Sequence, residues 1–150
     1  MPAPEPSRDI SISLIAVREV SAAIVYGLHE VFTCVGTVWE TLTGEQSETR
    51  RITPRIVGRT TEPIRTTFNV TLVPDYTFDE EHRTDVMIVG DLNFDDGGGP
   101  VGRWTDEIAW IHDQYERGAI ICSVCTGARG SRLAEPLRSD NSLGRTQCFR

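Results

Sequence analysis

The hydrophobic pattern of the chain consists mainly of short apolar runs rich in β-branched residues. Such runs, when turn residues bound them, are typical of strands buried on both faces of a sheet. The run over 52–59 contains Pro54, which has no backbone N–H to donate to a sheet ladder. This favours an edge strand, or a strand that starts after the proline. Residues 66–73 alternate polar and apolar side chains and predict a strand or a hairpin arm. The clearest runs predict three buried strands, over 10–17, 84–90 and 119–124.

Two segments carry apolar residues three or four positions apart, which predicts helices over 20–35 and 104–117. Gly36 and Gly118 follow these segments and are suitable residues for ending a helix. Thr105 is a suitable N-terminal cap for the second helix. The remaining connections are predicted to be a polar segment over 39–49, a short acidic and weakly helical segment over 78–83, and a flexible glycine-rich loop over 95–100.

Strands and helices alternate along the chain, which favours an α/β fold with a mostly parallel, doubly wound sheet and helices on both faces. In such sheets, functional sites lie at the carboxyl ends of the strands. We therefore expect three segments that are distant in sequence to meet at one edge: Arg18 and Glu19, residues 90–92, and Cys125 with Thr126.

The last predicted strand ends abruptly at Cys125-Thr126-Gly127, which predicts a sharp turn from strand to helix with Cys125 at its tip. The positive end of a helix dipole favours a thiolate, the reactive form of cysteine, so Cys125 is a candidate nucleophile. Gly127 would let the helix pass close to the sheet. The alternative is a buried strand with two inert cysteines, Cys122 and Cys125, which is common for this residue type. The predicted convergence of the three segments favours the functional interpretation.

Composition excludes several classes of protein. The 150 residues carry a net charge of −7, and an acidic chain without clustered cations is poorly suited to bind nucleic acid. No apolar stretch approaches the roughly 20 residues of a membrane span, and the first residues have no basic or apolar leader region. We therefore expect a cytoplasmic protein without a membrane partner, and its four cysteines to be thiols.

Neither a metal nor a cofactor is expected. Cys122 and Cys125 form a single C-x-x-C pair, which without a second pair or a nearby histidine is a weak zinc motif. His29, His82 and His112 are scattered and lack partners at ligand spacing.

The segments over 86–90 and 121–128, with the helix before Gly118, resemble the DJ-1/PfpI superfamily, which has the class I glutamine-amidotransferase-like, flavodoxin-like fold. The variant in isocyanide hydratases and in the N-terminal domains of AraC-type transcription regulators is the most similar. Those proteins carry Cys-Thr-Gly at the elbow and a Gly-x-x-Glu-Val-Phe pattern in the first helix, matched here by residues 27–32. The resemblance covers about residues 10 to 128.

The resemblance implies that Cys125 is the reactive residue and that an acidic residue near the start of the first helix hydrogen-bonds it. The corresponding position, six residues before Glu30, holds Ile24, and Glu19 lies in the preceding turn. Loss of the proton-transfer partner typically costs about 10²–10⁴-fold in rate. In the family, a glycine-rich turn after the strand over 86–89 supplies backbone N–H donors to an oxyanion. In this chain the turn over 90–92 contains one glycine. The implied ligand-binding or oxyanion-binding residues are Gly90, Asp91, Thr126 and Glu19.

Residues 129–150 depart from the family's pattern. They hold five arginines and two acidic residues, a net charge of +3, whereas residues 1–128 hold 10 arginines and 20 acidic residues, a net charge of −10. The predicted organisation is a disordered arm over 1–9, an α/β domain over 10–128 that is incomplete at its C-terminus, and a divergent basic tail over 129–150. We favour foreign or frameshifted sequence over a tail that binds an acidic partner.

Three functional hypotheses follow. The first is a ligand-sensing or vestigial domain related to the N-terminal part of AraC-type regulators, without the DNA-binding part, binding a small molecule and forming a homodimer. The second is a hydratase or hydrolase in which Cys125 attacks an electrophilic carbon. The third is a redox-responsive protein in which Cys125 is oxidised and Cys122 resolves the sulfenic acid. The replacement of the acid by Ile24 favours the first.

Overall fold

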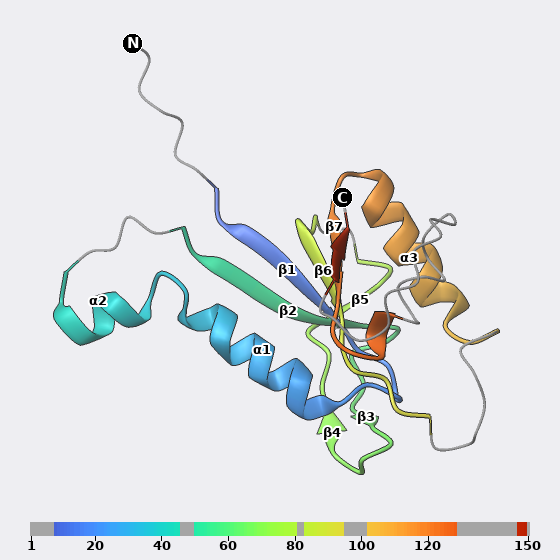
Figure 1. Cartoon of the computed structure of the whole chain (residues 1–150). Helices are drawn as coiled ribbons and strands as arrows, with labels where there is room; N and C mark the ends of the chain where they lie inside the picture. The colour runs from blue at the N-terminus through green and yellow to red at the C-terminus, as the bar shows by residue number, and fades with distance from the viewer. Residues whose placement is uncertain (1–7, 46–49, 81–82, 95–101, 129–146, 150) are drawn as a thin grey trace.

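A six-stranded sheet forms the centre of the computed structural model, which describes residues 8–45, 50–80, 83–94, 102–128 and the backbone of 147–149 (Figure 1). Five neighbouring strands run parallel, and the sixth is antiparallel to its neighbour. In sheet order the strands are β5 (Tyr76–Thr77), β2 (Ile52–Gly58), β1 (Ile10–Ile15), β6 (Val86–Val89), β7 (Ile120–Ser123) and β8 (Gln147–Phe149). The predicted α/β fold with a mostly parallel sheet is confirmed.

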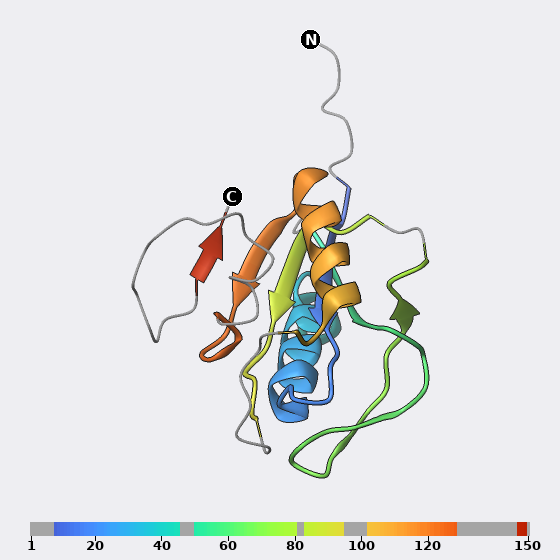
Figure 2. The same ribbon diagram turned by 90° about the vertical axis from the view of Figure 1, so that its right-hand side faces the viewer.

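Helices α1 (Ala22–Cys34) and α3 (Thr105–Glu116) cover opposite faces of the sheet (Figure 2). The central strands are therefore buried on both sides, which explains why their sequences are continuously apolar. On β1, for example, Leu14 and its neighbour Ile15 point to opposite faces and are 1% and 3% exposed. Among the described residues, no helix has the length and apolar character needed to cross a membrane.

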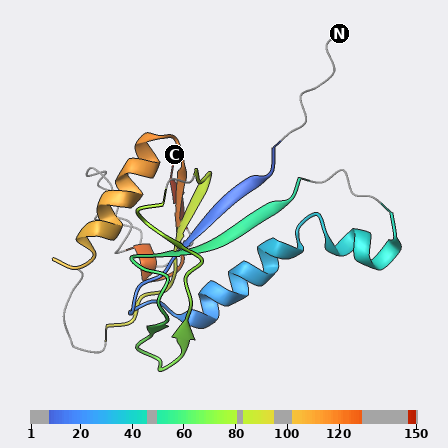
Figure 3. The ribbon, with the colours of Figure 1, turned by 180° about the vertical axis from the view of Figure 1, so that it is seen from behind.

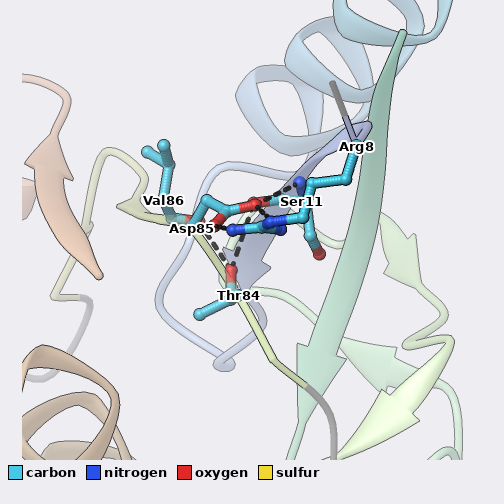
Figure 4. Close-up of polar contacts among 5 residues, drawn as sticks. All are labelled: Arg8, Ser11, Thr84, Asp85 and Val86. Carbon is cyan, nitrogen blue, oxygen red and sulfur yellow. Dashed lines mark hydrogen bonds and ion pairs between the residues drawn. The ribbon is translucent and has the colours of Figure 1, made fainter. Parts of the chain in front are cut away.

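Asp85 fixes the register of β1 and β6 at the amino edge of the sheet (Figure 4). Its backbone N–H donates to Ser11 O at 2.9 Å, and its Oδ2 accepts from Ser11 N at 2.9 Å. The Arg8 guanidinium contacts both carboxylate oxygens, with Nη1 2.8 Å from Oδ2. The hydrogen bond from Arg8 is the main reason that the pKa of Asp85 lies below its usual value. Burial opposes this effect, and the hydrogen bond from the Ser11 amide adds a smaller contribution that lowers the pKa. Thr84 adds a bond from its hydroxyl to Val86 O at 2.9 Å.

Strand β2 begins at Ile52, so the predicted late start is wrong. Pro54 pairs with Ile12 of β1 on one side, whereas β5 reaches only Val57 and Gly58 on the other. Pro54 therefore lies in a part of the strand that has one described neighbour, where the missing N–H costs no ladder hydrogen bond. The predicted edge strand is also wrong, because β2 lies between β5 and β1 in the sheet.

The segment predicted as a strand or hairpin arm forms a small antiparallel hairpin, β3 (Ile64–Arg65) with β4 (Thr71–Leu72). Asn69 in its turn has φ 63°, a conformation that asparagine tolerates. The Tyr26 hydroxyl accepts from Val73 N at 3.1 Å and lies 3.3 Å from Thr71 O, which ties the hairpin to α1. The hairpin and α1 lie close together in the view from behind (Figure 3).

Several elements differ from the sequence prediction. Helix α2 (Val38–Thr43) overlaps the segment predicted to be a polar connection over 39–49, and β5 was not predicted. Residues 78–80 form a turn rather than a helix, and residues 81–82 and the predicted loop over 95–100 lie outside the described residues. Gly118 ends α3 as predicted, with φ 95°. Its N-terminal cap is Trp104, with φ 56°, whereas Thr105 is the first helical residue, so the predicted cap is wrong.

At the end of the chain, the backbone of β8 pairs with β7 so that Cys148 lies opposite Cys122. Cys122 is disulfide-bonded, whereas Cys34 and Cys125 are free. The expectation that all four cysteines are thiols is therefore wrong. Residues 1–7, 129–146 and 150 lie outside the described residues, so the predicted arm, the boundary at residue 128 and the origin of the tail stay predictions.

Candidate ligand site at the carboxyl edge of the sheet

The chain turns sharply after β7, with Cys125 at the tip. Cys125 is exposed and has φ 50°, which is uncommon for a residue other than glycine, asparagine or aspartate. Val124 N donates to Val89 O at 2.9 Å, which anchors the turn to the end of β6. Gly127 N then donates to Val124 O at 2.9 Å as the chain enters a helical turn. These contacts describe a strand–turn–helix geometry around Cys125, while its role as a nucleophile stays a prediction.

Gly127 allows the close approach of this turn to the sheet. A Cβ at position 127 would lie 2.3 Å from Gly90 O and 2.4 Å from Val89 O, far inside van der Waals contact. Only glycine fits here without a shift of the backbone.

The three segments predicted to converge at this edge are in contact. Val20 and Leu92 form an isolated antiparallel bridge, and Asn93 N donates to Glu19 O at 2.8 Å. The hydroxyl of Thr126 accepts from Leu92 N at 2.9 Å and lies 2.5 Å from Asp91 Oδ1. Asp91 and Thr126 are thus hydrogen-bonded to each other. Through these hydrogen bonds, the turn after β6 connects the elbow to the segment that follows β1.

Ile24 lies beside the same turn. Both Ile24 and the elbow lie close to Gly90. The Cγ2 atom of Ile24 is 3.8 Å from the position that a Cβ on Gly90 would occupy, and Gly127 of the elbow packs against the Gly90 carbonyl. An aliphatic side chain therefore lies near the elbow, at the position where the family resemblance implies a carboxylate. Among the described residues, no side chain forms a hydrogen bond with the Cys125 thiol. The described residues also contain no group of three side chains suited to hold a metal ion.

Glu19 is buried at the end of β1, only 7% exposed, and its carboxylate is bound within the protein. Oε1 accepts from Arg103 Nη1 at 2.8 Å, and Oε2 accepts from Trp104 Nε1 at 3.0 Å. A buried carboxylate needs such charged and hydrogen-bonding partners. Arg103 and Trp104 were not predicted as site residues. Their place directly before a helix that leads into a parallel strand could have indicated them, because such a helix begins at the carboxyl edge of the sheet.

A cavity of about 380 Å³ lies between the ends of β1 and β2 and the start of α3. Its charged lining consists of Arg18, Arg59, Arg103, Glu19 and Glu107. Arg59 Nη2 is 2.9 Å from Glu107 Oε2 and 3.3 Å from Asp106 Oδ2, and these contacts raise the pKa of the guanidinium. Cys125 is not among the lining residues, so the cavity and the elbow are separate features of the same edge.

The disulfide at Cys122 bears on the third hypothesis. A cysteine that is already disulfide-bonded cannot attack a sulfenic acid on Cys125. The predicted resolving role of Cys122 therefore does not fit this structure.

No family model and no curated protein sequence matches the chain. Solved structures do match it. A ThiJ/PfpI family protein from Pseudomonas syringae is similar at 20% identity and a TM-score of 0.60, over 89% of this chain and 52% of that one. A two-domain protein from Anabaena variabilis, with DJ-1/ThiJ/PfpI-like and ferritin-like domains, is similar at 14% identity and a TM-score of 0.58, over 91% and 35%. The chain thus spans about half or less of these two proteins.

An AraC family transcriptional regulator from Pseudomonas putida is also similar, at 14% identity and a TM-score of 0.53, over 82% of this chain and 69% of that one. At this level of identity the comparisons define the fold. The chain has the fold of the DJ-1/PfpI superfamily, as its sequence resemblance predicts, and AraC family regulators are among its structural neighbours.

Proposed function

We propose that this chain is a ligand-sensing domain with the DJ-1/PfpI fold, related to the N-terminal part of AraC-type regulators, and that it does not catalyse a reaction at Cys125. One observation carries the proposal. The acidic residue at the end of β1, Glu19, is bound to Arg103 and Trp104, while Ile24 lies near the elbow at the expected acid position. Cys125 therefore lacks a described group that could exchange a proton with it.

The cavity beside Glu19 supports a binding role. Its volume lies in the range of pockets that hold small molecules, and it combines apolar walls with a few fixed polar groups. It also lies at the carboxyl edge of a doubly wound sheet, where such folds bind their ligands. The similarity to the P. putida regulator supports a role in sensing rather than in direct contact with DNA, since this chain is acidic.

The proposal is tested by comparing the wild-type protein with the Cys125→Ser variant. With an activated ester and a small isocyanide as electrophilic probes, we expect equal rates for the two proteins, because the thiol has no acid–base partner. A thermal-shift screen of small molecules should find ligands that stabilise both proteins, since a ligand that binds only the folded state raises its stability. Turnover that is lost in Cys125→Ser would refute the proposal.

The exposed thiol at positive φ favours one alternative, a cysteine-dependent hydratase or hydrolase. This alternative needs Cys125 to be a thiolate near neutral pH. It predicts that iodoacetamide alkylates Cys125 almost as fast at about pH 6 as at about pH 8. A rate that rises steeply over this interval would exclude it. Cys34, which is exposed on α1, is the internal control in the same experiment.

A further inference from the structure

A second pocket, of about 350 Å³, lies between the turn after β5 and helix α3. The turn contributes residues 78–80, and α3 with its C-terminal cap contributes Trp110, Asp113, Gln114 and Arg117. This Gln114 pocket shares no lining residue with the cavity beside Glu19, and the proposed function does not use it.

The side-chain amide of Gln114 has no hydrogen-bond partner. Gln114 is only 3% exposed, and its Oε1 is buried without a donor. Within the described part of the chain, its Nε2 binds no acceptor either. Buried polar groups are nearly always paired in folded proteins, because an unpaired one costs free energy. The last torsion of a glutamine side chain is soft, so the amide can turn its oxygen toward a donor in the pocket. The unpaired amide therefore indicates a ligand that donates a hydrogen bond.

The carboxylates of the pocket favour a positively charged donor. Asp113 Oδ2 lies 3.0 Å from Arg117 Nε, so these two charges compensate each other. Glu80 Oε2 accepts from Thr77 N at 2.6 Å and is held within the protein. Asp79 is exposed, and among the described residues its carboxylate has no hydrogen bond or ion pair. Asp79 is thus a charged acceptor that is available to a ligand.

Phe78 and Trp110 form an aromatic wall of the same pocket. Their ring centroids are 5.2 Å apart and the rings are tilted by 49°. Trp110 is 8% exposed and Phe78 is half-buried, so both rings are held by packing. The face of an aromatic ring attracts a cation, and tryptophan attracts one most strongly. This wall suits an aromatic body that carries a positive charge.

We propose that the Gln114 pocket binds a small arylalkylammonium ion. Its N–H groups donate to the Asp79 carboxylate and to Gln114 Oε1, and its ring lies against Phe78 and Trp110. An ammonium group has three donors and no acceptor, which matches a site that offers acceptors. An alcohol of the same shape can donate one hydrogen bond only, and an anion would be repelled by Asp79. The inference goes beyond the proposed function and does not depend on it.

The test uses matched pairs of amines and alcohols: benzylamine and benzyl alcohol, 2-phenylethylamine and 2-phenylethanol, tryptamine and 3-(2-hydroxyethyl)indole. Each pair has nearly the same shape, and only the amine is charged at pH 7. Binding to the full chain is measured by ligand-observed NMR and isothermal titration calorimetry. We expect at least one amine to bind at least tenfold more tightly than its alcohol, and this binding to weaken at high salt.

Two variants locate the site. Asp79→Asn keeps the shape of an exposed side chain and should weaken binding of the amine at least tenfold. Gln114→Met keeps the length of the side chain and should weaken binding at least fivefold. It should not lower the stability of the free protein, because it removes an unpaired buried amide. A glutamine with only a structural role would not show this combination. If Gln114→Met does not fold, Asp79→Asn still decides.

The matched control is Glu30→Gln, which removes one exposed negative charge from α1 on the opposite face of the sheet (Figure 2). It should leave binding unchanged. Amines that bind no better than their alcohols, or that bind equally well to Asp79→Asn or to a folded Gln114→Met, would overturn the inference. Such a failure would leave the proposed function as it stands, because that proposal is tested at Cys125 and by the thermal-shift screen.

Discussion

Gly127 lies where the elbow crosses the end of β6, and its environment leaves no room for a side chain. We predict that Gly127→Ala destabilises the protein by about 1–3 kcal/mol, because the added methyl group would press on two backbone carbonyls. Urea denaturation followed by circular dichroism measures the change. The matched control is Gly27→Ala in α1, where nothing lies within 4 Å of the added Cβ, and we expect that variant to be stabilised by up to about 1 kcal/mol. Equal effects of the two variants would contradict the described elbow.

The cysteines differ in state, and this can be measured directly. Without reductant, we expect iodoacetamide to alkylate Cys34 and Cys125, which are free and exposed, but not Cys122, which is buried and disulfide-bonded. Peptide mass spectrometry of the native protein, with and without prior reduction, identifies the alkylated residues. Alkylation of Cys122 without reduction would show that the disulfide does not form under the conditions used, and would restore Cys122 as a candidate resolving thiol.

At the scale of elements, the contact between Asp85, Arg8 and Ser11 joins the start of β1 to the start of β6 at the edge opposite the cavity (Figure 4). The pKa of Asp85 is lower in the folded than in the unfolded protein, mainly because of the hydrogen bond from Arg8. Its contribution to stability is therefore present above the unfolded value of about 3.9 and is lost as the pH falls through the lower folded value.

We predict that Asp85→Asn lowers stability at neutral pH but makes it less sensitive to acid than in the wild-type protein. The free energy of unfolding, measured in urea between about pH 7 and pH 3, tests this sign. Asp113→Asn is the control, because Asp113 forms only an exposed pair with Arg117 one helical turn away. The same loss of stability below about pH 4 in wild-type and Asp85→Asn proteins would contradict the prediction.

At the scale of the whole molecule, several large apolar side chains on α1 and α2 are exposed. Val31, Trp39 and Leu42 are 63%, 58% and 76% exposed, and α2 projects away from the sheet (Figure 1, Figure 3). Exposed apolar surface is typical of interfaces between proteins when it is contiguous. The homodimer expected from the sequence stays a prediction.

We predict that the protein self-associates through this surface and that Leu42→Glu shifts it toward the monomer. Sedimentation velocity at several concentrations measures the equilibrium. Thr41→Glu introduces the same charge at the neighbouring exposed position and should have a smaller effect, because it removes no large apolar side chain. A wild-type protein that is monomeric at all concentrations would contradict the prediction.

Local sequence determined most of the architecture. The apolar runs that became β1, β6 and β7 must be buried on both faces, which requires helices on both sides of a sheet. The small residues of Cys125-Thr126-Gly127 directly after such a run predicted the sharp turn of the elbow. These features depend on neighbours in the sequence, and for this reason they could be predicted from it.

Only the tertiary structure determined which partners the charged residues bind. Glu19 meets Arg103 across 84 positions of the chain and also accepts from Trp104, so its carboxylate is bound within the protein. The two-residue strand β5 exists because it pairs with the end of β2, and Cys122 is paired because the chain returns beside β7. A buried charge needs a partner of opposite charge or a hydrogen-bond partner, and the fold determines which residue lies close enough to serve. The spacing of residues along the sequence does not identify that partner.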